Sequence, residues 1–321
     1  MNPRARRYVL LTLGLTGALA GGLGLLNYWV DPYNRFGHNR LGVYISAERE
    51  SKSTEVRRYP HNALLLGNSR MAMIPVAQLN GFRFFNGALG GATAEETYYF
   101  VYHYVTRQDL VVLGVDLGAG DPPSLQGDIF LPPSLTSDLN ILLNLSTVEY
   151  SFRTISEHAA GHPSSLGADG SFNPTRWFEL YDHKDLPRLQ WQLQRLEREV
   201  ESYAGTTRER MSFYVKLADC LRRQGITCVV LVPPLHEEVA KHVRASPARA
   251  GLQTWRRQLE TLFPNVVDLS FSTYGAADNF FKCDPAHFKP EVGVRMLNAE
   301  VIPVALRALQ AKTNRPPAIA R

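Results

Sequence analysis

The sequence is poor in cysteine and has no CxxC motif. Its three cysteines are Cys220, Cys228 and Cys283. An odd number cannot be fully paired within one chain. Cys220 and Cys228 could form one disulfide between a predicted helix and the strand after it, or both could be buried thiols. Without cysteine pairs or carboxylates at ligand spacing, the sequence predicts no metal ion and no other cofactor.

The chain also lacks a basic stripe with interleaved aromatic side chains, the pattern typical of nucleic-acid binding. Its 321 residues include 35 Lys+Arg and 30 Asp+Glu, and three of the arginines precede Tyr8. The remainder is therefore close to neutral. No Gly-x-Gly-x-x-Gly follows the first predicted strand, which argues against a dinucleotide site. We therefore predict no nucleic-acid partner.

Charge is absent from the 23 residues between Tyr8 and Val30. That length spans a bilayer. Arg4, Arg6 and Arg7 precede the run, and no basic residue follows it until Arg35, so the N-terminus is predicted to be cytoplasmic. We expect residues 8–30 to anchor the chain in the inner membrane by a single pass, with a periplasmic or otherwise extracytoplasmic body. Cleavage of a signal peptide after Ala18-Leu19-Ala20 is the alternative, and it also places the body outside the cytoplasm.

After the anchor, apolar strands alternate with amphipathic helices. This alternation predicts an α/β fold with a parallel sheet of about five strands, covered on both faces as in a flavodoxin-like three-layer sandwich. The predicted strands are Ala63–Leu66, Phe82–Asn86, Leu110–Leu117, Ile226–Val232 and Val266–Leu269. We expect a loop at Asp278–Lys289 and a final helix that begins at Pro290 and ends near Leu309.

The predicted domain organisation has four parts. Residues 1–30 form the cytoplasmic stub and the transmembrane anchor, and residues 31–61 form a linker. An α/β domain follows over residues 62–311. Its rhythm is interrupted at 118–200 by a turn-rich, mainly helical insertion, which we expect to shape the substrate site. Residues 312–321, which include Pro316-Pro317, are predicted to be a disordered tail.

A serine stands in a tight turn directly after the first predicted strand, in Gly67-Asn68-Ser69-Arg70. An open α/β sheet presents a nucleophile at the carboxyl end of a strand in this way, although an N-cap serine gives the same pattern. A serine needs a base to take its proton, usually a histidine oriented by a carboxylate. Asp284 and His287 lie three residues apart in the last loop and are the candidates for these two roles.

An acyl-transfer site also needs donors for the developing oxyanion. The backbone N–H groups of Ser69 and of Gly87 or Gly90 are candidates, with the Asn86 side chain as an additional donor. We assign Arg70 and Asp116 to substrate binding, since both follow strands that end at the same edge. The alternative is a structural role for both residues, with Arg70 in a surface ion pair and Asp116 as a helix or loop cap.

These motifs resemble the SGNH (GDSL-type) hydrolase superfamily. Gly67-Asn68-Ser69-Arg70 stands in place of Gly-Asp-Ser, Asn86–Gly90 corresponds to the glycine block, and Asp284-Pro285-Ala286-His287 corresponds to Asp-x-x-His. The plan is similar to that of D-alanyl-lipoteichoic acid biosynthesis and alginate acetylation proteins, in the membrane-anchored branch. The resemblance covers residues 62–117 and 225–310. It departs at Asp116, where the family has an asparagine, because an ionised carboxylate cannot donate a hydrogen bond.

The resemblance implies a membrane-anchored serine esterase or O-acyltransferase that acts on an extracytoplasmic carbohydrate or cell-envelope polymer. It also implies a membrane acyl-transfer protein as a possible partner. Asp116 favours the alternative, a non-catalytic envelope polymer-binding or assembly protein that keeps the fold without the chemistry.

Overall fold

The computed structural model describes residues 2–43, 47–106, 108–116, 130, 134–175, 178, 181–183, 185–202 and 208–313. Its internal contacts divide the chain into two compact units. Unit 1 comprises Met1–Thr54 and Leu131–Gly167, and unit 2 comprises Glu55–Phe130 and Ala168–Arg321. Residues 131–167 of the predicted insertion thus group with the N-terminal helix, whereas residues from 168 onward group with the sheet.

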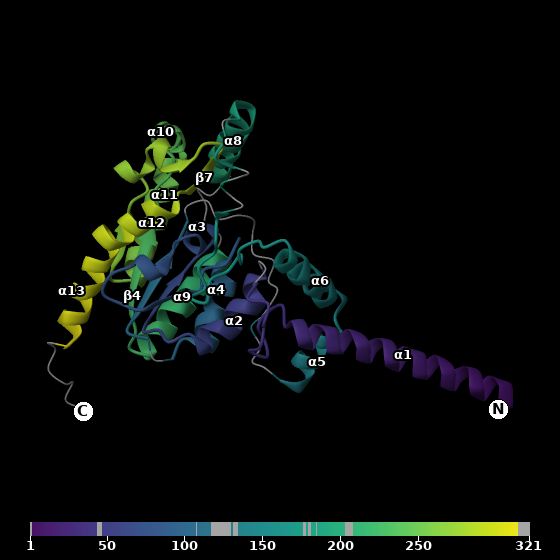
Figure 1. Cartoon of the computed structure of the whole chain (residues 1–321). Helices are drawn as coiled ribbons and strands as arrows, with labels where there is room; N and C mark the ends of the chain where they lie inside the picture. Colours follow the sequence, from purple (N-terminus) through teal and green to yellow (C-terminus); the bar gives the residue numbers. More distant parts are fainter. Residues whose placement is uncertain are drawn as a thin grey trace, which may run out of the picture. The chain divides into compact units, whose positions relative to one another are not determined.

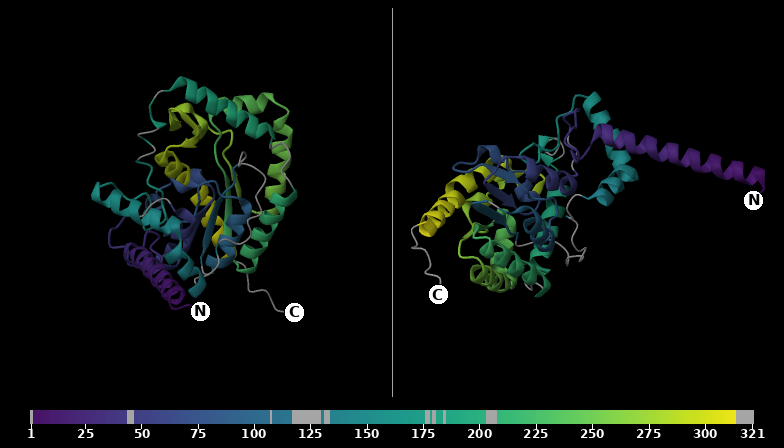
Figure 2. Two further views of the ribbon diagram at one scale, coloured as in Figure 1. Left: turned by 90° about the vertical axis from the view of Figure 1, so that its right-hand side faces the viewer. Right: turned by 90° about the horizontal axis from the view of Figure 1, so that it is seen from below.

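Unit 1 is built on the long helix α1 (Pro3–Val30), which is apolar and can cross a bilayer by length and composition. A signal sequence near an N-terminus satisfies the same criterion. Helices α5 (Leu135–Leu143) and α6 (Leu145–Ala159) contact α1 and lie beside its C-terminal part (Figure 1; Figure 2, right). Helix α2 (Glu48–Arg58) begins in unit 1 and ends in unit 2.

Unit 2 contains the predicted sheet, and all five of its strands are parallel. Their order is β2-β1-β3-β4-β5. The strands are β1 (Ala63–Leu66), β2 (Phe84–Asn86), β3 (Leu110–Gly114), β4 (Thr227–Val232) and β5 (Val266–Asp268). The α/β class and the five-stranded parallel sheet are therefore confirmed. Strand β3 ends before the predicted Leu117, which lies outside the described residues.

Both faces of the sheet are buried, because successive side chains of each strand point in opposite directions. In β1, Leu64 and Leu66 join one hydrophobic cluster, whereas Ala63 and Leu65 join another. This explains why the strands consist of continuous apolar runs instead of alternating patterns.

The helices of unit 2 supply the outer halves of these two clusters (Figures 1 and 2). On the Leu64 side lie α4 (Ala94–Tyr104), α9 (Arg208–Arg223), α10 (Glu237–Ala245) and α11 (Ala248–Leu262). On the Leu65 side lie the short α3 (Ser69–Ala72), α12 (Pro290–Met296), a π-helical turn η4 (Leu297–Val301) and α13 (Ile302–Thr313). Helix α8 (Leu186–Ser202) also belongs to this unit.

Two segments differ from the sequence-based expectation. Residues predicted as the loop Asp278–Lys289 contain a two-stranded antiparallel hairpin, β6 (Phe280–Phe281) and β7 (Asp284–Phe288). Burial of both phenylalanines of β6 explains the hairpin, since an irregular loop would bury unpaired backbone groups. The last helix continues to Thr313, beyond the predicted Leu309; residues 314–321 of the predicted tail lie outside the described residues.

The loop at Gly170 packs against the edge of the sheet more closely than any side chain allows. A Cβ atom on Gly170 would lie 2.3 Å from the Asn86 carbonyl oxygen, and its φ of +79° is unfavourable for other residues. We expect Gly170→Ala to lower the free energy of unfolding by about 2–4 kcal/mol through overlap and strain. Gly91→Ala is the control, because Gly91 also has a positive φ (+64°) but nothing lies within 4 Å of its Cβ position. Urea unfolding should separate the two variants; equal losses would contradict the close approach.

Candidate functional site

The turn after β1 places Ser69 at the start of α3. Gly67 makes this turn possible, because its φ is +138° and an added Cβ would lie 2.8 Å from the Gly114 carbonyl oxygen. Asn68 is the N-cap residue, and its Oδ1 accepts a hydrogen bond from the Arg70 N–H at 3.1 Å. Ser69 therefore follows the cap residue and is not the cap itself, which removes the simplest structural explanation for a serine at this position.

The hairpin β6–β7 supplies the other two predicted residues. Phe280 pairs with Phe288, and Phe281 pairs with Asp284. The phenylalanine side chains are buried, so the hairpin is held in the core while His287 remains half-buried. The Asp284 carboxylate is buried, and its Oδ1 accepts the Ala286 N–H at 3.1 Å. This bond fixes the orientation of the carboxylate within its own strand.

Ser69, His287 and Asp284 form a continuous hydrogen-bonded chain. Ser69 Oγ lies 2.8 Å from His287 Nε2, and His287 Nδ1 lies 2.8 Å from Asp284 Oδ2. Both distances are within the range required for proton transfer between a nucleophile and its base. The structure thus brings together three residues that the sequence separates by 218 positions between serine and histidine.

The hydrogen-bond partners assign the tautomer of His287. An ionised carboxylate only accepts hydrogen bonds, so the proton of a neutral ring lies on Nδ1, facing Asp284. Nε2 is then left to accept the Ser69 hydroxyl proton. A general base needs this arrangement, since its free nitrogen must face the group that loses the proton.

Arg70 and Asp116, both predicted to bind substrate, bind each other. Arg70 Nη1 lies 3.0 Å from Asp116 Oδ1, and the two side chains are only 7% and 14% exposed. Asn68 Nδ2 donates to the second oxygen, Asp116 Oδ2, at 3.2 Å. This geometry gives Asp116 a structural role after β3 and ties it to the residues on either side of Ser69.

Two groups in this network were missed by sequence reasoning. Arg70 Nη2 donates to the Pro234 carbonyl, and its guanidinium lies 5.3 Å from the centre of the Phe288 ring. Pro233-Pro234 directly follows β4, so the sequence already placed the Pro234 carbonyl near the sheet edge at which Ser69 lies. The Phe288 ring could not be placed, because that required the hairpin.

Two of the predicted oxyanion donors are occupied by other acceptors. The Gly87 N–H donates to the Leu65 carbonyl at 2.9 Å and so extends the pairing of β1 and β2. Asn86 Nδ2 lies within 3.1 Å of the carbonyl oxygens of Met71, Ala72 and Ile74. The Asn86 side chain therefore stabilises the segment after Ser69. Neither the Asn86 amide nor the Gly87 backbone retains an N–H for an oxyanion.

The Ser69 N–H remains the best-placed donor of the predicted set. It donates no hydrogen bond to any group in the described part of the chain. Gly90, the other predicted donor, lies in the turn before α4, whose Thr93–Glu96 capping box is present as expected.

His236 caps α10 next to the Arg70 network and should make the protein acid-sensitive. Its Nδ1 accepts the Glu238 N–H at 3.3 Å, which only an unprotonated nitrogen can do. Burial lowers the pKa of His236, while Glu237 and Glu238 oppose this shift more weakly. Below about pH 6.5 the unfolded chain therefore binds this proton more readily than the folded chain, and stability decreases as the pH falls.

We expect His236→Asn, which keeps an N-cap acceptor without a titrating group, to reduce the loss of stability between pH 8 and pH 5.5. Thermal unfolding of both proteins at the two pH values measures this difference. Burial also lowers the pKa of His61, and that background is the same in both proteins. Parallel losses in variant and wild type would contradict the assignment to His236.

The three cysteines are buried and unbridged, so the possible pair Cys220–Cys228 is not bonded. Burial raises the pKa of the Cys228 thiol to about 12, which makes it unreactive at neutral pH. Across the described ranges, no group of three or more His, Cys, Asp or Glu side chains is arranged to hold a metal ion.

No protein-family model matches the chain, and no curated protein matches it significantly.

Proposed function

We propose that the protein is a membrane-anchored serine esterase or O-acyltransferase that acts on an extracytoplasmic carbohydrate or cell-envelope polymer. The observation that carries this proposal is the hydrogen-bonded chain from Ser69 through His287 to Asp284. An N-cap serine or a surface histidine needs no such chain. A histidine held by a buried carboxylate and aimed at a half-buried serine is the arrangement that activates a hydroxyl nucleophile.

In the proposed first half-reaction, Ser69 Oγ attacks the acyl carbon while His287 Nε2 takes the hydroxyl proton. The C–O bond to the leaving alcohol then breaks, and His287 returns the proton to that alcohol, which leaves an acyl-serine. Asp284 stabilises the transient imidazolium without accepting its proton. The Ser69 N–H stabilises the oxyanion.

In the second half-reaction, His287 deprotonates an acceptor hydroxyl, which attacks the acyl-serine and releases Ser69. Water as the acceptor makes the protein an esterase, and a sugar hydroxyl makes it an acyltransferase. In the latter case a membrane acyl-transfer protein is the proposed donor partner. The anchor supports these roles, because it would tether the protein to the membrane in which such acyl donors are held.

The strand order supports membership of the SGNH hydrolase superfamily. Order 2-1-3-4-5 is that of flavodoxin-like sheets, and such sheets carry their sites at the carboxyl ends of the strands. Ser69 follows β1, Asp116 follows β3, and the Gly87–Gly90 turn follows β2 at that edge. We also infer that α1 is an uncleaved inner-membrane anchor with a cytoplasmic N-terminus, and that residues 118–200 are a mainly helical insertion.

The alternative, a non-catalytic polymer-binding protein, loses its main argument. Asp116 favoured it because a carboxylate cannot donate to an oxyanion. Its ion pair with Arg70 and its bond from Asn68 give Asp116 a different role, which is compatible with a working serine.

A fluorophosphonate probe tests the proposal directly, because it bonds covalently to activated serines. We expect labelling of the full-length protein in detergent and none of the Ser69→Ala variant. Ser272→Ala serves as the matched control and should label as well as wild type. Equal labelling of wild type and Ser69→Ala, or no labelling of either, would overturn the serine-hydrolase assignment.

A further inference from the structure

Helix α5 of unit 1 is apolar but has no buried residue. Leu135, Leu139 and Leu143 are 78%, 48% and 52% exposed. They follow one another at intervals of four residues, so they form a stripe along one face of the helix. Contiguous exposed apolar surface of this kind marks a protein-interaction or membrane-interaction site.

The C-terminal end of α5 is fixed to α1 by Asn27. The Asn27 amide Nδ2 donates to the Leu142 carbonyl at 2.8 Å, and its Oδ1 accepts the Ser151 hydroxyl of α6 at 2.9 Å. Asn27 is only 1% exposed. A carbonyl in the last turn of a helix has no partner within that helix, so the bond from Asn27 stabilises the end of α5. It also satisfies a polar side chain within a segment that can span a membrane.

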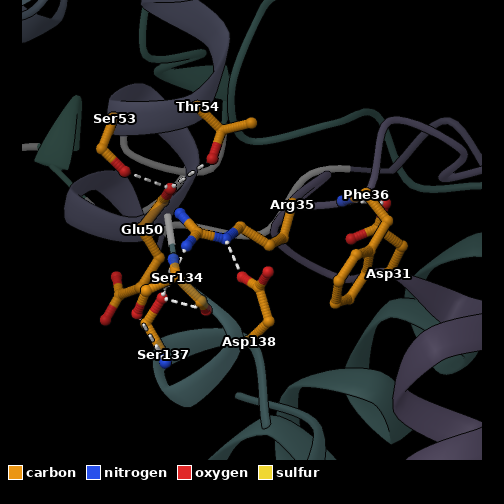
Figure 3. A network of polar contacts seen from close by, with 9 residues as sticks. All are labelled: Asp31, Arg35, Phe36, Glu50, Ser53, Thr54, Ser134, Ser137 and Asp138. Carbon is orange, nitrogen blue, oxygen red and sulfur yellow. Dashed lines mark hydrogen bonds and ion pairs between the residues drawn. The ribbon is translucent and has the colours of Figure 1, made fainter. Parts of the chain in front are cut away.

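The N-terminal end of α5 is fixed to the loop that follows α1 (Figure 3). Arg35 Nε lies 2.9 Å from Asp138 Oδ1, and Arg35 Nη2 donates to Ser137 Oγ at 3.0 Å. Ser134 and Ser137 form a capping box at the same end. With both ends held, the leucine stripe faces one fixed direction relative to α1.

The position along α1 indicates what the stripe contacts. A Cβ atom on Gly24 would lie 3.7 Å from Leu143 Cδ2, so α5 meets α1 at this level. Gly24 lies four and five residues, or about 6 to 8 Å, before Tyr28 and Trp29, which are 49% and 60% exposed. Exposed aromatic residues at the end of a membrane span lie at the lipid headgroups. Leu143 is therefore at the depth of the hydrocarbon edge when α1 spans the bilayer.

From this placement we propose that α5 is an interfacial helix that inserts Leu135, Leu139 and Leu143 into the leaflet at the C-terminal end of α1. The leucine stripe contacts the lipid bilayer, because it continues the apolar surface of α1. The most apolar stretch of α1 is 0% buried within the protein. Amphipathic helices bind membrane interfaces in this way. The proposal depends on α1 spanning the membrane and is independent of the chemistry at Ser69.

The membrane contact has a consequence for unit 1. A single helix leaves the attached segment free to rotate about the helix axis, whereas a second contact beside it restricts that rotation. Two contacts at different distances from the axis hold Arg35, which is bonded to α5, at a constant height above the headgroups. Unit 1 then holds the chain in a fixed orientation at the membrane surface and does not act as a flexible tether.

Site-specific fluorescence tests the depth of α5. Full-length protein would be labelled with the polarity-sensitive dye NBD at Leu139→Cys and reconstituted alone into phosphatidylethanolamine–phosphatidylglycerol vesicles. The native cysteines are buried, which limits background labelling. Leu15→Cys in α1 reports insertion of the anchor. Leu186→Cys on α8, where Leu186 is 52% exposed, is the matched control for an exposed leucine outside the stripe.

We expect the dye at position 139 to be quenched by a nitroxide on the lipid chains and to be several-fold less sensitive to aqueous iodide than the dye at position 186. If the dye at position 15 is quenched by the lipid nitroxide while position 139 behaves like position 186, the anchor holds and the docking proposal is overturned. Iodide protection at 139 without nitroxide quenching, increasing with the protein-to-lipid ratio, would overturn it in favour of a second copy of the chain.

Discussion

Replacing Ser69 by alanine should lower the turnover of p-nitrophenyl acetate by about 10⁴- to 10⁶-fold, the loss typical of removing the nucleophile from a serine triad. The expectation rests on the 2.8 Å contact between Ser69 Oγ and His287 Nε2, which supplies the only base identified for this hydroxyl in the described ranges. His287→Ala should cause a loss of similar size, because an unactivated serine hydroxyl is a weak nucleophile at neutral pH.

The double variant makes this prediction sharper. Residues that act as one unit give strongly non-additive losses. We therefore expect Ser69→Ala/His287→Ala to be no slower than either single variant. Asp284→Asn should retain the geometry but favour the wrong tautomer of His287, with a loss of about 10⁴-fold. Steady-state kinetics in detergent measures all four.

The matched control for the histidine is His242→Ala. His242 is a partly exposed side chain in unit 2 that pairs with Glu201 at 2.9 Å, remote in sequence from every residue of the triad. Its removal should leave turnover unchanged. A double variant whose loss equals the product of the single losses would mean that Ser69 and His287 act independently, which contradicts a shared proton transfer.

Breaking the ion pair between Arg70 and Asp116 should have the largest effect on stability. Arg70→Met leaves the Asp116 carboxylate without its cationic partner, and an uncompensated buried charge costs about 3–5 kcal/mol. The pair is largely buried, with side-chain exposures of 7% and 14%, so screening by water reduces this cost only in part. In a domain of this size such a loss lowers the melting temperature by roughly 10 °C.

A surface pair provides the control for this prediction. Arg222 and Asp219 are separated by 2.7 Å, but their side chains are 67% and 47% exposed. Arg222→Met should therefore cost less than about 1 kcal/mol. Restoring charge balance in Arg70→Met/Asp116→Leu should recover part of the stability lost in Arg70→Met. Equal melting temperatures for Arg70→Met and Arg222→Met, measured by circular dichroism, would show that the inner pair is not buried in solution.

The sheet could be predicted from the sequence because its strands give a strong local signal, whereas the Gly-x-Ser turn that pointed to Ser69 is a weak signal on its own. Continuous apolar runs identify buried parallel strands, and all five predicted runs contain one. Ser69, Asp284 and His287 were chosen by residue type and spacing. That choice does not depend on where the predicted helices begin and end.

The partners of those residues could not be predicted in the same way. The Gly87 N–H looked available because sequence patterns do not show how far β1–β2 pairing continues, and it continues to Gly87. The roles of Arg70 and Asp116 depend on the distance between two strand ends, which only the register of β1 and β3 determines. The hairpin at Phe280–Phe288 was missed because Pro285 and His287 carry no strand signal, and burial of the phenylalanines overrides that weak preference.

The loop at Asp169–Gly170 has a further consequence for the solubility of unit 2. Strand β2 is the edge of the sheet, and the Asn86 N–H on its free side donates to the Asp169 carbonyl at 2.7 Å. An uncovered edge of this kind recruits strands from neighbouring molecules and leads to aggregation. Because only glycine permits the close approach at position 170, one small residue keeps the edge occupied from within the same chain. Loss of that contact would expose the Asn86 edge of the sheet as a template for association between copies.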